Sequence, residues 1–158
     1  MDVHEAEGRS VTLLASETQV LAIFAVADTI KDSSRQALTE LHALGVSSVM
    51  LTGDNTATAQ SIARQAGIDD ARGDLLPEDK LAAIEELQKR YGLTAMTGDG
   101  INDSPALARS DMGFAMGGAG TDTAMEAADV VIMNDDLRRI SETIRLSHRT
   151  RTILLQNI

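Results

Sequence analysis

Short apolar runs alternate along this chain with longer stretches in which apolar side chains recur every three or four residues. The runs that predict β-strands are 46–51, 93–96, 112–116 and 130–133. Strands buried on both faces read as short continuous apolar runs, and the helices that connect parallel strands read as amphipathic stretches. The alternation therefore predicts an α/β fold of three layers, a parallel sheet covered by helices.

Three helices have clear boundaries in the sequence. The spans 33–44 and 55–66 each end on a glycine, Gly45 and Gly67, as helices commonly do. Pro77 suits the first turn of a third helix, which acidic residues favour at its start and Gly92 ends. A final helix is expected from 135–136 toward the apolar cluster at 153–158.

The front of the chain differs from this pattern. Residues 1–10 are mostly polar, and two β-rich runs, 11–15 and 20–27, follow with a short polar connection between them. Two such runs joined by a few polar residues predict a β-hairpin.

Composition narrows the classes of function. A chain of 158 residues with 43% hydrophobic residues is one domain in size, and it has no cysteine for disulfides or thiolate chemistry. Its formal net charge of −10 argues against nucleic acid and anionic lipid as partners. Because no run of eighteen apolar residues and no signal pattern occur, we expect a soluble, cytoplasmic chain.

Candidate chemistry gathers where predicted strands end, which is where α/β sheets bind ligands. Thr52, Gly53 and Asp54 follow the first strand, and a hydroxyl with backbone N–H groups at a helix N-terminus suits a phosphate. Such a turn can equally be a plain helix cap. A third turn, 117–122, is glycine-rich and is as often a flexible connection.

The second turn is the most acidic of the three. Asp99 leaves its strand, and Asn102 with Asp103 opens the next helix, so oxygen ligands of the kind Mg²⁺ prefers converge there. Lys80 offers a positive charge for a phosphoryl group, although a lysine taken alone usually lies in solvent. Together these groups suit phosphoryl transfer, which depends on positioning and charge neutralisation.

The order of these motifs resembles that of the P-type cation-transporting ATPases. The series is Thr-Gly-Asp-Asn at 52–55, Leu-Pro-Glu-Asp-Lys at 76–80 and Thr-Gly-Asp-Gly-Ile-Asn-Asp-Ser-Pro-Ala-Leu at 97–107. Ala-Asp-Thr-Ile-Lys at 27–31 and the Ala-Ala-Asp at 127–129 resemble flanking signatures of the family, so the likeness covers about 18–158. The stretches 116–124 and 135–138 resemble the heavy-metal branch, above all its zinc, cadmium and lead exporters.

The resemblance implies a haloacid-dehalogenase-like (Rossmann-type) fold and a role for each site residue. Thr52 and Lys80 would be the catalytic residues that hold the phosphoryl group, and Asp99 and Asp103 would bind Mg²⁺. Gly53, Asp54 and Asn102 would complete the cofactor site, with ATP bound in the complete enzyme.

The family's Asp-Lys-Thr-Gly-Thr sequence, which carries the phosphorylated aspartate, does not occur here. The resemblance then implies that 1–19 ends a nucleotide-binding domain, 20–148 is phosphorylation-domain core without its nucleophile strand, and 149–158 is a stalk toward a membrane helix. The partners would be the nucleotide-binding, actuator and membrane domains of the ATPase, on the cytoplasmic side of a membrane. We expect the isolated chain to be inactive.

Two other functions remain open at this stage. A soluble phosphatase of the same superfamily would need its own nucleophile, for which Asp28 is the only candidate at a strand end. A non-catalytic binding module would keep affinity for Mg²⁺ and phosphate without turnover. A missing central strand would also expose two sheet edges, which predicts a homodimer unless the run 20–27 fills the gap.

Overall fold

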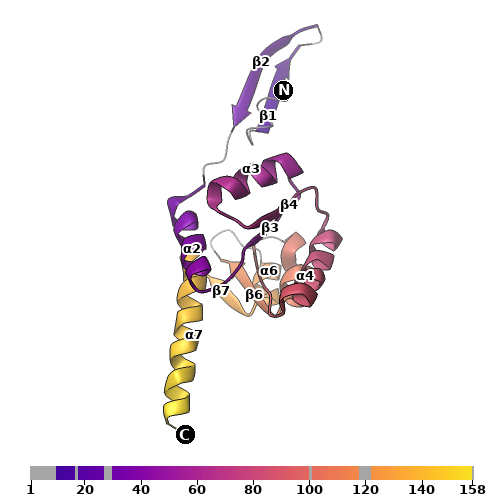
Figure 1. Cartoon of the computed structure of the whole chain (residues 1–158). Coiled ribbons are helices and arrows are strands. Elements are labelled where there is room, and N and C mark those ends of the chain that lie inside the picture. The colour runs from indigo at the N-terminus through magenta and orange to yellow at the C-terminus, as the bar shows by residue number, and fades with distance from the viewer. Residues whose placement is uncertain (1–9, 17, 27–29, 100, 118–121, 158) are drawn as a thin grey trace.

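The computed structural model describes residues 10–16, 18–26, 30–99, 101–117 and 122–157. It confirms the α/β prediction, with a body of short strands and covering helices (Figure 1). The strands are β1 (Ser10–Ala15), β2 (Val20–Val26), β3 (Val49–Leu51), β4 (Asp70–Arg72), β5 (Ala95–Gly98), β6 (Met112–Met116) and β7 (Val130–Ile132). The helices are α2 (Asp32–Ala43), α3 (Thr56–Ala66), α4 (Pro77–Tyr91), α5 (Ser104–Arg109), α6 (Asp122–Ala127) and α7 (Arg138–Gln156), with a 3₁₀ turn, η1 (Ile101–Asp103), before α5.

The strands of the body pair in parallel, as predicted, but in two separate groups. β3 pairs with β4, and β5, β6 and β7 form a second group in that order. In the part of the chain that the structure describes, no strand joins β3 to β5. The parallel sheet is therefore interrupted between them.

The run 20–27 does not close this interruption. Its described part, β2, pairs antiparallel with β1 from Ser10 opposite Val26 onward, which confirms the hairpin. The connecting turn is held by the Ser16 N–H, which donates to the Gln19 carbonyl at 2.8 Å. The hairpin projects away from the body (Figure 1), and the predicted boundary between residues 19 and 20 falls within it.

The strands β5, β6 and β7 contribute to two different apolar clusters. Phe114 packs with Ile132 of β7 and Ile140 of α7, and Leu41 of α2 joins this cluster. The other cluster unites α4, α5 and α6 with β5 through Ile84, Met96, Ala106, Leu107 and Ala124. Helices thus cover both faces of the β5–β7 sheet, which gives the three layers that the sequence predicts.

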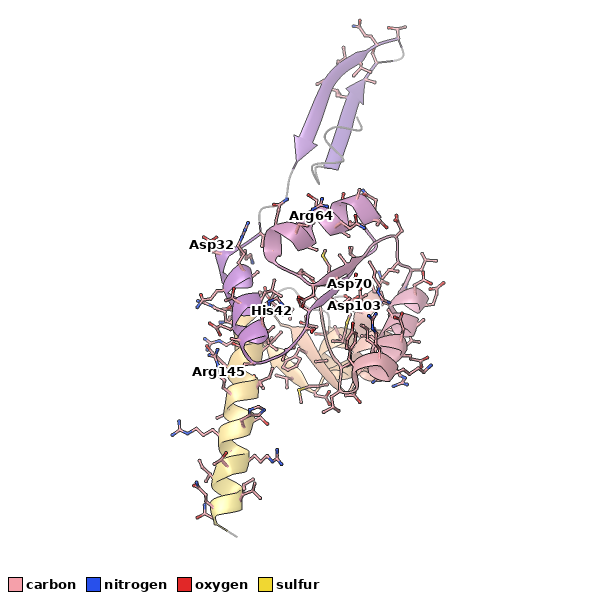
Figure 2. The ribbon with its side chains drawn as sticks, viewed as in Figure 1. Asp32, His42, Arg64, Asp70, Asp103 and Arg145 are labelled. Carbon is pink, nitrogen blue, oxygen red and sulfur yellow. The ribbon has the colours of Figure 1, made fainter. Side chains whose placement is uncertain are left out.

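α2 and α7 are joined by a small polar junction as well as by apolar contacts. The Ser141 hydroxyl, fully buried, donates to a Glu40 carboxylate oxygen at 2.6 Å, and Arg145 donates to the same oxygen at 3.2 Å. Figure 2 shows Arg145 on α7 where this helix lies beside α2. The Ser141 hydrogen bond is the main reason why the pKa of Glu40 lies below its ordinary value. The junction fixes the start of α7 against the body.

Low pH should lower the stability of the fold, because it protonates carboxylates that accept hydrogen bonds in the folded chain. The Arg138 guanidinium lowers the pKa of Asp136 from 3.8 to about 2, and the pKa of Glu40 is lowered in the same sense. A carboxylate whose pKa falls on folding stabilises the fold above its unfolded pKa and loses that contribution as pH falls through its folded pKa. We expect the melting temperature, followed by circular dichroism, to fall between pH 4.5 and 2. Asp136→Asn should flatten this fall; a variant with an unchanged pH profile would contradict the assignment.

Candidate functional site

The turn after β3 is closed by its own side chains. The Thr52 hydroxyl donates to the Asp54 carboxylate at 3.1 Å, and the Asp54 N–H donates to the Thr52 oxygen at 3.1 Å. The helix cap is a different residue, because Asn55 accepts from the Thr58 N–H at 2.8 Å. Thr52 and Asp54 are therefore brought together, and neither is needed to cap α3.

A second loop, which the sequence did not single out, holds this turn in place. The Asp74 N–H donates to the Asp54 carbonyl at 2.6 Å, and the Leu75 N–H donates to the Thr52 carbonyl at 3.1 Å. The Asp74 carboxylate accepts from the Thr56 N–H at 3.0 Å and from its hydroxyl at 2.7 Å, which lowers the pKa of Asp74. Asp74 does this from a left-handed conformation, φ 57°. The Gly73-Asp74 pair was the available signal, since such dipeptides mark tight turns.

Lys80 and Asp103 form the most enclosed pair of the predicted site residues. The Lys80 Nζ lies 2.8 Å from the Asp103 Oδ1, with side chains only 15% and 14% exposed. Lys80 is held in the first turn of α4, whose start is fixed by the Leu76 N–H donating to Asp79 at 2.9 Å. The interpretation of Lys80 as a solvated surface lysine is therefore wrong.

Asp103 reaches Lys80 by folding back across the end of β5. A Cβ atom added to Gly98 would lie 2.7 Å from the Asp103 Cβ and 2.9 Å from its Oδ2. Only a glycine at this position leaves room for the carboxylate. The glycine of the Thr-Gly-Asp motif is therefore required at this position for steric reasons.

Asp99 and Asn102 are exposed beyond this pair. The Asp99 carboxylate has no hydrogen-bond partner among the residues described. Nor do the described residues contain a group of three or more His, Cys, Asp or Glu side chains that could hold a metal ion by themselves. Two carboxylates still fit Mg²⁺, which commonly takes one or two from the protein and completes its shell with water and phosphate oxygens.

The turn after β3 shares a core with the Lys80–Asp103 pair. Leu51, which precedes Thr52, packs against the cluster that contains Ile84 of α4 and Met96 of β5. The packing thus joins the two sheet groups on either side of the interruption. Open α/β sheets bind ligands at the carboxyl ends of their strands, and the candidate residues lie at the ends of β3 and β5.

Some predicted features have a structural explanation or lie outside the described residues. The Asp129 carboxylate accepts from the Gly113 N–H at 2.8 Å, which ties the loop before β7 to β6. Asp28 and most of the glycine-rich turn at 117–122 belong to the residues that the structure does not describe.

The Lys80–Asp103 pair can be tested as a unit. Lys80→Met should lower the free energy of unfolding by about 2 kcal/mol, because it leaves a carboxylate enclosed without its cation. Combining it with Asp103→Leu should restore much of that loss, since no charge is then left enclosed. Urea unfolding of the wild type, both single variants and the double variant measures the coupling, and strict additivity would contradict a direct pair.

Comparisons with known proteins agree with this arrangement. The model of the haloacid dehalogenase-like hydrolases matches residues 1–111. A probable cadmium-transporting ATPase of Alkalihalophilus pseudofirmus is 49% identical over 153 residues, covering 96% of this chain and 21% of that protein. A copper-exporting P-type ATPase of Bacillus subtilis is 48% identical over 158 residues, covering all of this chain and 20% of that protein.

Solved structures give the same result. A zinc-transporting PIB-type ATPase in its E2.Pi state matches with a TM-score of 0.88 and 40% identity, over 99% of this chain and 25% of that one. The chain spans about a fifth of the length of the curated relatives it matches. It therefore belongs to the haloacid dehalogenase-like hydrolases, and nearly its whole length matches one segment of heavy-metal P-type ATPases, as the motif series predicts.

Proposed function

We propose that this chain supplies the phosphate- and Mg²⁺-binding half of the aspartyl-phosphate site of an ATP-driven heavy-metal exporter. The enclosed Lys80–Asp103 pair supports this most directly, because an ammonium group is fixed at the end of β5 beside an interrupted sheet. A strand that entered between β3 and β5 would carry its last residue to that end. The phosphorylated aspartate belongs on such a strand, supplied by the rest of the ATPase.

Each residue has a distinct task in this proposal. The Thr52 hydroxyl would turn from Asp54 to a phosphoryl oxygen, while Lys80 neutralises charge that builds up on the transferred group. Asp103 is a positioning residue that holds the Lys80 ammonium through their 2.8 Å contact. Fixed charges of this kind stabilise the transition state without having to reorganise during the reaction.

Asp99 would hold Mg²⁺, with Asn102 and the free oxygen of Asp103 beside it. When bound, the ion supplies charge neutralisation between phosphate oxygens and carboxylates that would otherwise repel one another. Gly53 and Asp54 would face the nucleotide, which is ATP in the complete enzyme.

We further propose zinc, cadmium or lead as the exported ion, on the resemblance of 116–124 and 135–138 to that branch. Overall identity does not separate the ions, because the cadmium- and copper-transporting relatives are 49% and 48% identical. The nucleotide-binding, actuator and membrane domains would be the partners, which would place the chain on the cytoplasmic face of a membrane.

The test is complementation in trans. This chain is mixed with a second polypeptide from a related ATPase that carries the Asp-Lys-Thr-Gly-Thr strand and the nucleotide-binding domain, and Mg²⁺ and ATP are added. Intact mass should show a phosphate adduct on the second polypeptide only when both are present. Lys80→Met and Asp99→Asn in this chain should abolish it, and Arg64→Gln, a surface change, should not.

The same measurement separates the other two functions. This chain alone, incubated with Mg²⁺ and acetyl phosphate, should gain no mass. An adduct that disappears in Asp28→Asn would identify a self-sufficient phosphatase and overturn the proposal. Stabilisation by Mg²⁺ with no adduct in either experiment would instead favour a binding module.

The interruption of the sheet between β3 and β5 also predicts that the isolated chain associates with itself. β3 and β5 each present an unpaired edge in the described structure, and unpaired edges attract other strands. We expect a homodimer through these edges in size-exclusion chromatography with light scattering. The complementing polypeptide should dissociate it, and a strict monomer at high concentration would contradict this expectation.

A further inference from the structure

The two groups expected to hold the phosphoryl group lie on different elements of the fold. Thr52 follows β3, and Lys80 lies in the first turn of α4, which comes after β4 (Figure 1). One phosphoryl group can contact both only if their spacing is fixed, because a displacement of about 1 Å costs roughly 100-fold in rate. The contact with Asp103 fixes Lys80 relative to the end of β5. The spacing between Lys80 and the turn after β3 needs a connection of its own.

Asp74, in the loop between β4 and α4, makes this connection. Its N–H donates to the Asp54 carbonyl at 2.6 Å, and its carboxylate oxygen Oδ2 accepts from both the N–H and the hydroxyl of Thr56. The next N–H, that of Leu75, donates to the Thr52 carbonyl at 3.1 Å. The loop is therefore bonded to the turn after β3 at its first residue, in its middle and at the start of α3.

The other end of this loop leads directly into α4. Leu76 precedes the helix; its N–H donates to the Asp79 carboxylate at 2.9 Å, and its carbonyl accepts from the Lys80 N–H at 3.1 Å. Only Leu75 separates Leu76 from Asp74. A displacement of Asp74 therefore reaches the first turn of α4, and with it Lys80, over a short stretch of hydrogen-bonded chain.

The backbone of Asp74 has a conformation that its contacts must support. Its φ of 57° lies in the left-handed region, which is unfavourable for residues other than glycine. Strain of this kind persists where surrounding contacts hold it, and it is found most often at functional sites. A glycine would fit this position without strain. The aspartate is therefore explained by what its carboxylate does.

We propose that Asp74 is a positioning residue for phosphoryl transfer, which sets the spacing between the Thr52 hydroxyl and the Lys80 ammonium. The inference rests on the proposed function, and it assigns Asp74 no contact with the substrate. Loss of the carboxylate frees the loop from Thr56, so the first turn of α4 shifts relative to β3. The chemical step then slows, while the complementing polypeptide still binds, since its docking between β3 and β5 does not involve this carboxylate.

Asp74→Gly in the 158-residue chain is the first variant to test. Glycine keeps the left-handed backbone and the N–H that is bonded to Asp54, and it removes only the carboxylate. We expect the rate of adduct formation, at saturating second polypeptide and ATP, to fall about tenfold, less than for a full displacement because the N–H bond remains. The concentration of second polypeptide that gives half of the maximal rate should not change. An increase in this concentration together with a lower urea midpoint would show general damage and overturn the positioning role.

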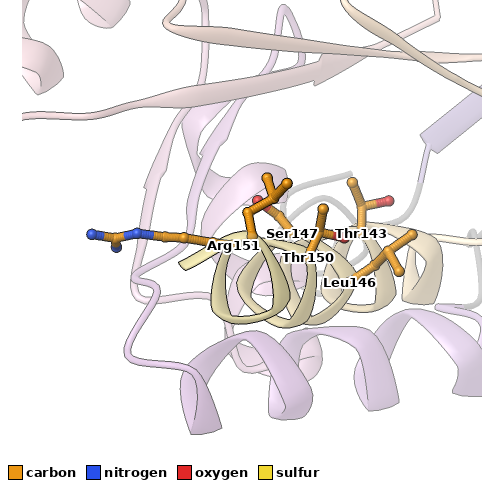
Figure 3. A pocket seen from close by; sticks show the side chains of 6 residues that line it. Thr143, Leu146, Ser147, Thr150 and Arg151 are labelled. Carbon is orange, nitrogen blue, oxygen red and sulfur yellow. The ribbon is translucent and has the colours of Figure 1, made fainter. Parts of the chain in front are cut away.

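Three further variants test the hydrogen bonds of this carboxylate. Asp74→Asn retains an oxygen that can accept from Thr56, so it should keep most of the rate that Asp74→Gly loses. Thr56→Val removes one of the two donors and should lower the rate about threefold. Thr143→Val is the matched control: its hydroxyl donates to the Arg139 carbonyl at 2.8 Å, beside a shallow hollow on α7 (Figure 3). This control should leave the rate unchanged.

Hydrogen exchange of the Leu75 N–H gives a readout that does not depend on phosphorylation. In Asp74→Gly this N–H should exchange about tenfold faster, because the loop separates more often from Thr52. A wild-type rate of adduct formation in Asp74→Gly, or an equal loss in Thr143→Val, would overturn this inference alone. Absence of an adduct with the wild-type chain would overturn the proposed function, and the positioning role with it.

Discussion

Gly73→Ala is expected to lower the free energy of unfolding by about 3 kcal/mol, the largest loss expected from an added methyl group at any glycine that the structure describes. A Cβ atom at this position would lie 2.6 Å from both the Thr56 Cα and the Thr56 N, and 2.7 Å from the Asp54 carbonyl oxygen. These are backbone atoms at the start of α3 and in the turn after β3. They cannot move aside as the end of a flexible side chain could, so the loop at 73–75 would have to separate from the turn.

Gly67→Ala is the control, because Gly67 has an unusual backbone conformation but no close neighbours. Gly67 has a φ of +80° but nothing within 4 Å of an added Cβ, so Gly67→Ala should cost only the backbone strain of about 1 kcal/mol. Urea unfolding of both variants measures the difference. Equal losses would contradict the view that close packing, rather than conformation, requires Gly73.

The sequence predicted correctly those helices and strands whose limits are marked by neighbouring residues in the chain. α3 and α4 begin and end within one residue of their predicted limits, because a proline or an asparagine cap marks each start and a glycine follows each end. β6 was predicted with the same bounds because its five residues form a short apolar run, whose three central residues are buried. These features depend on neighbours in the chain and therefore appear in a local pattern.

β4 was missed for the corresponding reason. It is a three-residue strand, Asp70–Arg72, two of whose residues are charged, and it exists because its backbone pairs with β3. Arg72 is further held by Glu86 of α4 at 2.7 Å. A strand defined by its partners leaves no apolar run, so periodicity could not find it.

The same difference between local signals and long-range contacts applies to the candidate site. The ordered motifs identified Thr52, Lys80, Asp99 and Asp103 as candidates, but they did not say which of them touch. The structure pairs Lys80 with Asp103 across 23 residues of sequence and leaves Asp99 exposed. Contacts of this kind depend on how α4 packs beside β5, and that packing is set by the shared core around Ile84 and Met96.

Gly98→Ala should cause a large functional loss, although it removes neither charge of the Lys80–Asp103 pair. The added methyl group would overlap the Asp103 side chain at 2.7 Å, so Asp103 must leave the end of β5 and release Lys80. A misplaced ammonium group no longer neutralises the phosphoryl group, and losses of this kind are typically about 100-fold or more in rate. The phosphate adduct formed in trans with the complementing polypeptide should fall by that factor.

A double variant separates this mechanism from general damage to the fold. In Asp103→Gly the Cβ atom and the carboxylate that the new methyl group would overlap are both absent, so adding Gly98→Ala should cause almost no further loss of adduct formation. The rate of adduct formation is measured by intact mass in quenched time courses for the wild type, both single variants and the double variant. If the two substitutions instead reduce the rate independently, Gly98 is required for something other than room for Asp103, and the positioning role assigned to Asp103 would have to be abandoned.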